Sequence, residues 1–196
     1  MPSIISPLLL ATVLLDLVGA INIFVSHYSG TVQTLTLTPK TDGSYSLTTN
    51  SSVNVGGQPS WMTFDPTSRT IYNSDETGSG SAILTSVSAA KDGKLSLSGK
   101  ATGLSLGGVH NTLYGPGYIA VAHYQTSTIT TYKLPLSSST KPIDSLKYTM
   151  SRPGPNAGRG KDLSEETSQA VLHLKVLSSS RNHYSTSPRL FISNKI

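Results

Sequence analysis

The chain has 196 residues, enough for one ordinary domain, of which 36% are hydrophobic and only 13% charged. Its 17 glycines, 11 prolines and many Ser and Thr residues favour strands joined by tight turns over long helices, and the lack of cysteine excludes disulfides, thiol catalysis and zinc sites built on Cys. The net charge of +5 comes from residues 141–196, where the basic residues are scattered, so we expect no nucleic-acid partner.

The N-terminal segment carries an apolar run over residues 4–18, followed by the small residues Gly19 and Ala20. Pro7 and Asp16 interrupt the run, which leaves it too short to span a bilayer. We expect residues 1–20 to be a signal peptide and the mature protein to be secreted, with no membrane contact after cleavage. The run has no Lys or Arg before it, and a buried first strand is the alternative.

The first part of the expected secreted chain contains alternating or short apolar segments separated by turn signals. Four strands are expected, at residues 31–37, 44–48, 61–64 and 70–72. Turn residues separate them at Asp42-Gly43, Gly56-Gly57 and Asp65-Pro66. Four short strands with three turns match the anatomy of one propeller blade.

The same unit recurs further along the chain. Its second copy is marked by residues 81–87, Asp92-Gly93, 94–97, Gly107-Gly108 and 118–122, and residues 127–133 open a third. His27-Tyr28 and His123-Tyr124 provide a second marker of the repeat. The separation of these copies along the chain suits propeller blades, which run to about 40–50 residues.

The repeat predicts an all-β fold, a partial β-propeller of two and a half to three four-stranded blades over residues 21–159. Residues 160–196 are expected to form a divergent, irregular tail, in which 162–177 fits a helix and 171–177 fits a strand equally well. Because propellers close with typically 4–8 blades, we expect that missing blades or self-association are needed for closure.

The stretch Gly56-Gly-Gln-Pro-Ser-Trp-Met-Thr-Phe-Asp-Pro66, followed by Ile71-Tyr72 and Asp75-Glu76, resembles a blade of the seven-bladed lactonase family. This family includes 6-phosphogluconolactonase and the fungal 3-carboxymuconate cyclases. The resemblance extends over residues 22–159 and implies lactone hydrolysis or lactone-forming cyclisation, acting on a small-molecule lactone or carboxylate. After Arg159 the family's His-Pro-His segment is replaced by Gly160-Lys161, which suggests a C-terminally truncated member.

Two residues are candidates for acid/base catalysis, which lactone chemistry requires. Glu76 follows the last strand of a predicted blade; the alternative is that Asp75 and Glu76 only cap the turn at Thr77. His110 follows a glycine pair at the position that Pro59 takes in the preceding unit, where it would line the central channel.

Three further residues have assigned candidate roles. Arg159 matches the family's loop arginine and would hold a substrate carboxylate, and His123 is a second substrate-binding candidate, although its match to His27 in the repeat suggests a structural role. Asn50 begins the chain's only glycosylation sequon, in a polar, turn-like stretch. Trp61, with Met62 beside it, is expected in the core.

No His, Asp or Glu cluster has metal-ligand spacing, so neither a metal nor a cofactor is expected. The sequence leaves open whether this chain is an active enzyme. The alternative is a non-catalytic secreted propeller fragment that binds glycan or protein, or a truncated product with no function.

Overall fold

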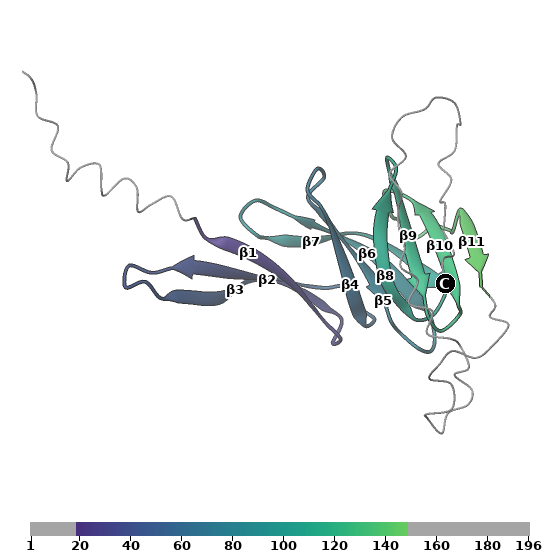
Figure 1. Ribbon diagram of the computed structural model, residues 1–196, viewed down its shortest axis with the longest axis horizontal. Helices are drawn as coiled ribbons and strands as arrows, with labels where there is room; N and C mark the ends of the chain where they lie inside the picture. Colours follow the sequence, from purple (N-terminus) through teal and green to yellow (C-terminus); the bar gives the residue numbers. More distant parts are fainter. Residues whose placement is uncertain (1–18, 149–196) are drawn as a thin grey trace, which may run out of the picture.

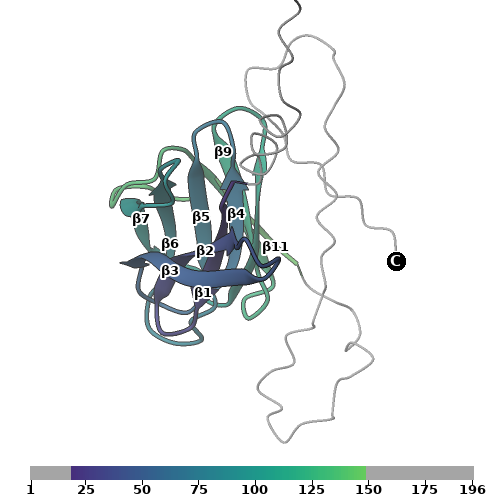
Figure 2. The same ribbon diagram turned by 90° about the vertical axis from the view of Figure 1, so that its left-hand side faces the viewer.

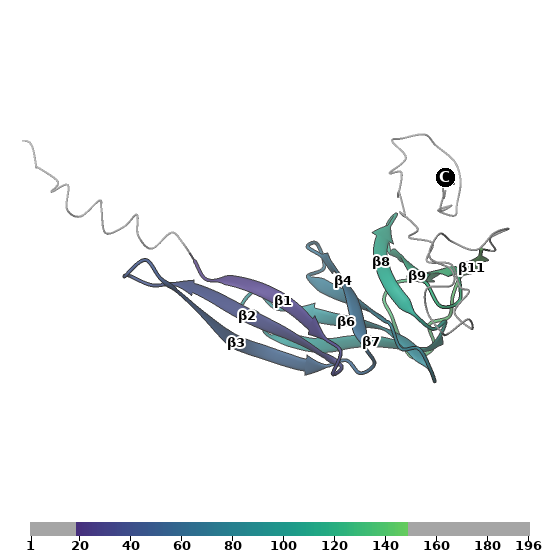
Figure 3. The same cartoon turned by 60° about the horizontal axis from the view of Figure 1, so that its bottom comes forward.

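The computed structural model describes residues 19–148, which form eleven strands and no helix. Three antiparallel sheets follow one another along the chain, and the second lies between the other two (Figures 1 and 3). The first comprises β1 (Ile21–His27), β2 (Thr31–Pro39) and β3 (Tyr45–Asn54). The second comprises β4 (Pro59–Asp65), β5 (Thr70–Asp75), β6 (Ala82–Ala89) and β7 (Leu95–Leu104). The third comprises β8 (Gly108–Tyr114), β9 (Tyr118–His123), β10 (Thr128–Lys133) and β11 (Asp144–Lys147). The predicted all-β partial propeller is confirmed.

The boundaries between blades differ from those that the sequence predicted. The four strands expected as one blade belong to two sheets, because the first two are β2 and β3 and the last two are β4 and β5. Gly56-Gly57 therefore links two sheets rather than two strands of one sheet. The strands β1, β8 and β11 were not predicted at all. The first sheet has no counterpart of β4 and β8 among the described residues.

The Asp-Gly turns were predicted correctly, and their geometry explains why these residues occur there. Asp42 Oδ1 accepts a hydrogen bond from the Ser44 backbone N–H at 2.9 Å, and Asp92 Oδ1 accepts one from the Lys94 N–H at 3.1 Å. Asp side chains favour turns because they bond to the backbone two residues further on. Each turn joins the last two strands of its sheet.

Apolar side chains fill the spaces between neighbouring sheets, and Figure 2 shows the first sheet in front of the second. The strand registers place Val32, Leu84 and Ile129 at equivalent positions, and all three are buried. Burying one such side chain contributes roughly 1.5–3 kcal/mol. The repeat thus supplies each sheet with the same core position.

The antiparallel order of the strands divides the turns between two ends of the sheets. One end, here called the linker face, holds the links between sheets at residues 55–58 and 105–107, together with the turns that follow β1, β5 and β9. The opposite face holds the turns that follow β2, β4, β6, β8 and β10. Within the described part of the chain, no helix is long and apolar enough to cross a membrane.

The link between the first two sheets is held by a buried carboxylate. Asp75 Oδ1 accepts a hydrogen bond from the Gln58 N–H at 2.7 Å. Gly57 has a φ of +65°, and a Cβ there would lie 2.6 Å from the Asp75 carboxylate. Both the backbone conformation and the close approach therefore require glycine.

The substitution Gly57→Ala should destabilise the protein much more than Gly43→Ala. Gly43 also has a positive φ, +80°, but a Cβ there meets nothing within 4 Å. Both changes carry the left-handed backbone penalty of about 1–2 kcal/mol, and overpacking against Asp75 adds roughly 1–3 kcal/mol at Gly57. Urea unfolding followed by circular dichroism measures both variants, and equal losses would contradict the described approach of Gly57 to Asp75.

Candidate functional site

The candidate base Glu76 lies on the linker face, immediately after β5. The Tyr28 hydroxyl donates a hydrogen bond to Glu76 Oε2, which joins the first two sheets through their side chains. This hydrogen bond, more than burial or the charge of Glu76, raises the pKa of Tyr28 above its ordinary value. Tyr28 is 57% exposed, so the pair is accessible from solvent.

The neighbouring Asp75 has a different environment, which separates the two carboxylates that the sequence placed together. Asp75 is 3% exposed, and its Oδ1 also accepts hydrogen bonds from the Thr77 N–H at 2.9 Å and the Thr77 hydroxyl at 2.6 Å. Its Oδ2 accepts from the Ile83 N–H at 3.0 Å. Asp75 therefore caps the turn at Thr77, as the structural alternative predicted, while Glu76 makes its side-chain contact with Tyr28.

The structure shows that Glu76 occupies a repeated position. His27, Asp75 and His123 end the second strand of the three blades, 48 residues apart in each step, so Tyr28, Glu76 and Tyr124 are equivalent. Tyr124 lies near enough to Tyr28 to contribute to the raised pKa of its hydroxyl. Tyr28, Glu76 and Tyr124 thus form a row of equivalent residues on the linker face. The sequence contained a signal for this row, because Asp75-Glu76 falls midway between the two His-Tyr pairs. Sequence reasoning did not use it.

The substrate-binding candidate His123 lies in the interior of the third sheet, 4% exposed. Its Nε2 is 2.7 Å from Thr130 Oγ1, which donates to the Tyr132 hydroxyl oxygen at 2.8 Å. Burial lowers the pKa of His123 to about 4, against a smaller opposing effect of the Ser105 carbonyl. The imidazole is thus neutral at physiological pH and directed into the blade.

The second catalytic candidate, His110, lies on β8 and contacts an aromatic residue of the neighbouring blade. Its ring centroid is 4.4 Å from that of Trp61 on β4, with an angle of 40° between the rings. Burial lowers the pKa of His110 below its ordinary value.

Two predictions about this pair of residues were wrong. Trp61 is 43% exposed rather than in the core, and the strand registers make it, not Pro59, the equivalent of His110.

The remaining candidates lie apart from these groups. Asn50 is exposed on β3 rather than in a turn, and its side-chain N–H donates to the Asp92 carbonyl at 2.7 Å. Arg159 and the expected signal peptide up to Val18 lie outside the described residues, as does the expected tail from residue 160. Within residues 19–148, no group of three or more His, Asp or Glu side chains could hold a metal ion.

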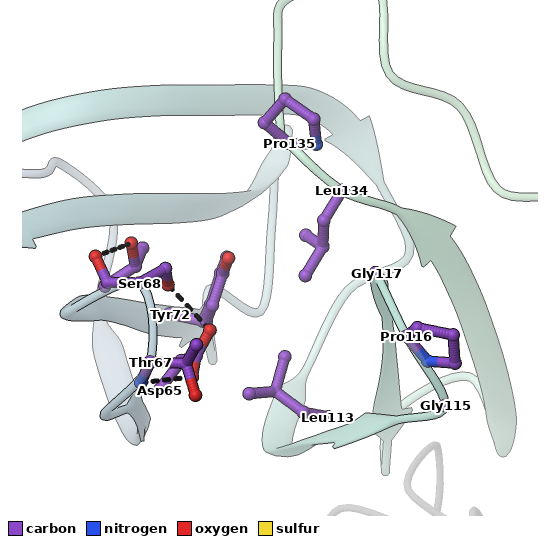
Figure 4. A pocket seen from close by; sticks show the side chains of 11 residues that line it. Asp65, Thr67, Ser68, Tyr72, Leu113, Gly115, Pro116, Gly117, Leu134 and Pro135 are labelled. Carbon is purple, nitrogen blue, oxygen red and sulfur yellow. Dashed lines mark hydrogen bonds between the residues drawn. The ribbon is translucent and has the colours of Figure 1, made fainter.

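A pocket of about 500 Å³ opens on the opposite face, between the second and third sheets. In Figure 4, Asp65 and Tyr72 lie on one side of it, and Leu113 and Leu134 on the other. The Ser68 hydroxyl donates to Asp65 at 2.6 Å and lowers the pKa of that carboxyl. The pocket contains none of the predicted site residues. The candidate chemistry and this cavity are therefore at different ends of the blades.

Solved structures of similar fold come from three bacteria. The periplasmic gluconolactonase PpgL of Pseudomonas aeruginosa is 19% identical with a TM-score of 0.54, and the alignment covers 71% of this chain and 42% of that one. A Lactobacillus plantarum protein is 10% identical with a TM-score of 0.55, covering 71% and 41%. A protein of Bacteroides fragilis solved as a candidate 6-phosphogluconolactonase is 15% identical with a TM-score of 0.50, covering 63% and 35%. The present chain thus spans about two fifths of these proteins or less.

No curated protein sequence matches the chain. The family described as "Lactonase, 7-bladed beta-propeller" matches residues 22–184, which is most of the present chain. That match agrees with the repeated four-stranded sheets, their shared core positions and the sequence around Trp61. The chain belongs to the seven-bladed β-propeller lactonase family.

Proposed function

We propose that the linker face of this protein carries part of a site for lactone chemistry, either ring hydrolysis or lactone-forming cyclisation, in which Glu76 acts as the general base in hydrolysis. The observation that carries the proposal is the exposed contact between Tyr28 and Glu76 in a chain of the lactonase family. The chain spans 35–42% of the similar structures, and the activity of the whole protein is part of this proposal.

The Tyr28–Glu76 contact fits this role. With Tyr28 donating to Oε2, Glu76 Oε1 is the oxygen that would accept a proton from water. That water would add to the lactone carbonyl, and collapse of the tetrahedral adduct would break the ring C–O bond. The proton held by Glu76 would pass to the leaving ring oxygen, which releases a hydroxyacid. The raised pKa of Tyr28 keeps its hydroxyl protonated and hence a donor throughout the neutral range.

The other predicted residues have supporting roles in the proposal. His123 is a positioning residue, because it is buried directly before Tyr124, which belongs to the same row as Tyr28 and Glu76. Arg159 would hold a substrate carboxylate, as its match to the family's loop suggests. In the lactone-forming cyclisation of an unsaturated substrate, an oxygen of this carboxylate would add to a C=C bond of the same molecule, and the other carbon of that bond would take up a proton.

We further propose that the protein is exported, with residues 1–20 as the signal and Asn50 as a glycosylation site. Asn50 is exposed, which a glycan requires, although its amide N–H would have to leave the Asp92 carbonyl. The gluconolactonase of Pseudomonas aeruginosa is periplasmic, which is consistent with export in this family.

The substitution Glu76→Gln tests the proposed base in the full chain. With glucono-1,5-lactone as substrate and proton release as the readout, we expect kcat/KM to fall about 10²–10⁴-fold, the usual contribution of a general base. Asp92→Asn is the matched control, because Asp92 is an exposed carboxylate on the opposite face. A Glu76→Gln variant as fast as the wild type would exclude the role. A wild type no faster than buffer would favour the non-catalytic alternative.

The buried His123 should make stability depend on pH between about 6.5 and 4. Its pKa is lower in the folded than in the unfolded state, so the unfolded chain binds a proton first and stability falls as pH falls through this window. The loss should reach roughly 3 kcal/mol. His110 adds a contribution of the same sign, whereas the carboxyls with lowered pKa values, such as Asp65, act below 3.8.

Urea unfolding of the wild type and of His123→Gln at several pH values measures this dependence. The variant should show a clearly flatter profile between pH 6.5 and 4, with the residual slope caused by His110. A wild-type profile that is flat across this window, or an unchanged slope in the variant, would show that His123 is not buried as described.

A further inference from the structure

Trp61 and His110 form a pair of rings on the first strands of two neighbouring blades. β4 and β8 lie side by side (Figure 1), and the ring centroids are 4.4 Å apart. Trp61 remains 43% exposed although His110 covers part of it. The indole of Trp61 therefore offers an accessible aromatic face beside a second ring, which suits contact with a ligand.

The same irregularity of the backbone places both rings. In β4 the register shifts between Pro59 and Trp61, and in β8 it shifts between Gly108 and His110. Such β-bulges insert one extra residue and change the direction of the following side chain, and they are frequent beside functional sites. The repetition of the bulge in successive blades indicates that the direction of these two side chains is a fixed feature of the fold.

Hydrogen bonds between the two strands hold the pair in place. The Ser60 hydroxyl donates to the Gly108 carbonyl at 2.9 Å, and the Thr63 hydroxyl donates to the Asn111 carbonyl at 2.8 Å. The buried Asn111 amide donates in turn to the Trp61 carbonyl at 3.3 Å. These bonds join the residues on both sides of the rings, so little conformational freedom is lost when a ligand binds there.

The chemistry of the pair selects an uncharged, polyhydroxylated ring. The indole face offers apolar contact to the C–H face of a sugar-like ring, while the indole N–H and the imidazole nitrogens can bond to its oxygens. Burial lowers the pKa of His110 and so favours its uncharged imidazole, which suits an uncharged ligand.

We propose that Trp61 and His110 form a stacking platform that binds the ring of a sugar-derived lactone. This assignment rests on the proposed lactone chemistry and names the two residues that would bind the substrate ring. Trp61 supplies the stacking surface, and His110 supports the indole on one side and bonds to a ring substituent. Sugar lactones combine an exposed C–H face with several hydroxyl groups and no charge, which matches the platform.

Trp61 is the only tryptophan of the chain, so its fluorescence reports directly on the platform. The full-length Glu76→Gln variant lacks the proposed base and should turn substrate over slowly. Its titration with glucono-1,5-lactone should give a saturable change in the emission of Trp61. Sorbitol, an open-chain polyol of similar size, should give none. His110→Ala should raise the Kd at least about 10-fold, equivalent to loss of one good contact. The matched control is Phe64→Leu, since Phe64 is a second exposed aromatic residue of β4.

The outcomes distinguish the platform from the proposed function. Saturable binding that His110→Ala weakens and Phe64→Leu does not would support the platform even if the wild type hydrolyses no lactone, in which case only the proposed function fails. Hydrolysis by the wild type without any saturable change in Trp61 emission would overturn the platform while the function stands. An unchanged Kd in a folded His110→Ala variant, or equal binding of sorbitol, would also overturn it. For an active wild type, Trp61→Phe should raise KM more than it lowers kcat.

Discussion

The buried carboxylate of Asp75 is the interaction on which the linker face depends. A buried charge is strongly unfavourable unless hydrogen bonds satisfy it, and Asp75 accepts four, from Gln58, Thr77 and Ile83. These donors belong to the link that enters the second sheet, to the turn after β5 and to the start of β6. One side chain therefore fixes three segments, and the direction of Glu76 follows from this arrangement.

The repeat uses this position differently in each blade. His27 at the end of β1 is exposed and lies 2.9 Å from the Ser29 hydroxyl, Asp75 anchors the link, and His123 is buried against Thr130. The next residue of each blade, in contrast, contributes to a common row on the linker face. Each of these residues directly follows the end of its strand and begins the turn on the linker face, so it is not part of the strand pairing. The position after the anchor is therefore available for function.

The sequence was sufficient to predict the fold class and eight of the eleven described strands, but neither β1, β8 and β11 nor the grouping of the strands into blades. Alternation and the Asp-Gly turns are local signals, and they located β2, β3, β6 and β7. Nothing local distinguishes a turn within a sheet from a link between sheets, so Gly56-Gly57 was misassigned. Trp61 was misplaced for a related reason. Its apolar neighbours suggest a core strand, whereas the bulge that exposes it depends on pairing with β5.

The strand register relates the two parts of the proposed site to each other. Pro59 pairs with Asp75, so Glu76 lies just beyond the end of β4, while Trp61 is two residues further along that strand. At 3.2–3.4 Å per residue, two residues correspond to about 7 Å along the strand, comparable with the width of a substituted lactone ring. A ring stacked on Trp61 would thus extend toward the face that carries Glu76. Binding is thus placed on the first strands of two blades and the base on a turn that the hydrogen bonds of Asp75 hold in place, so both parts of the proposed site are preorganised.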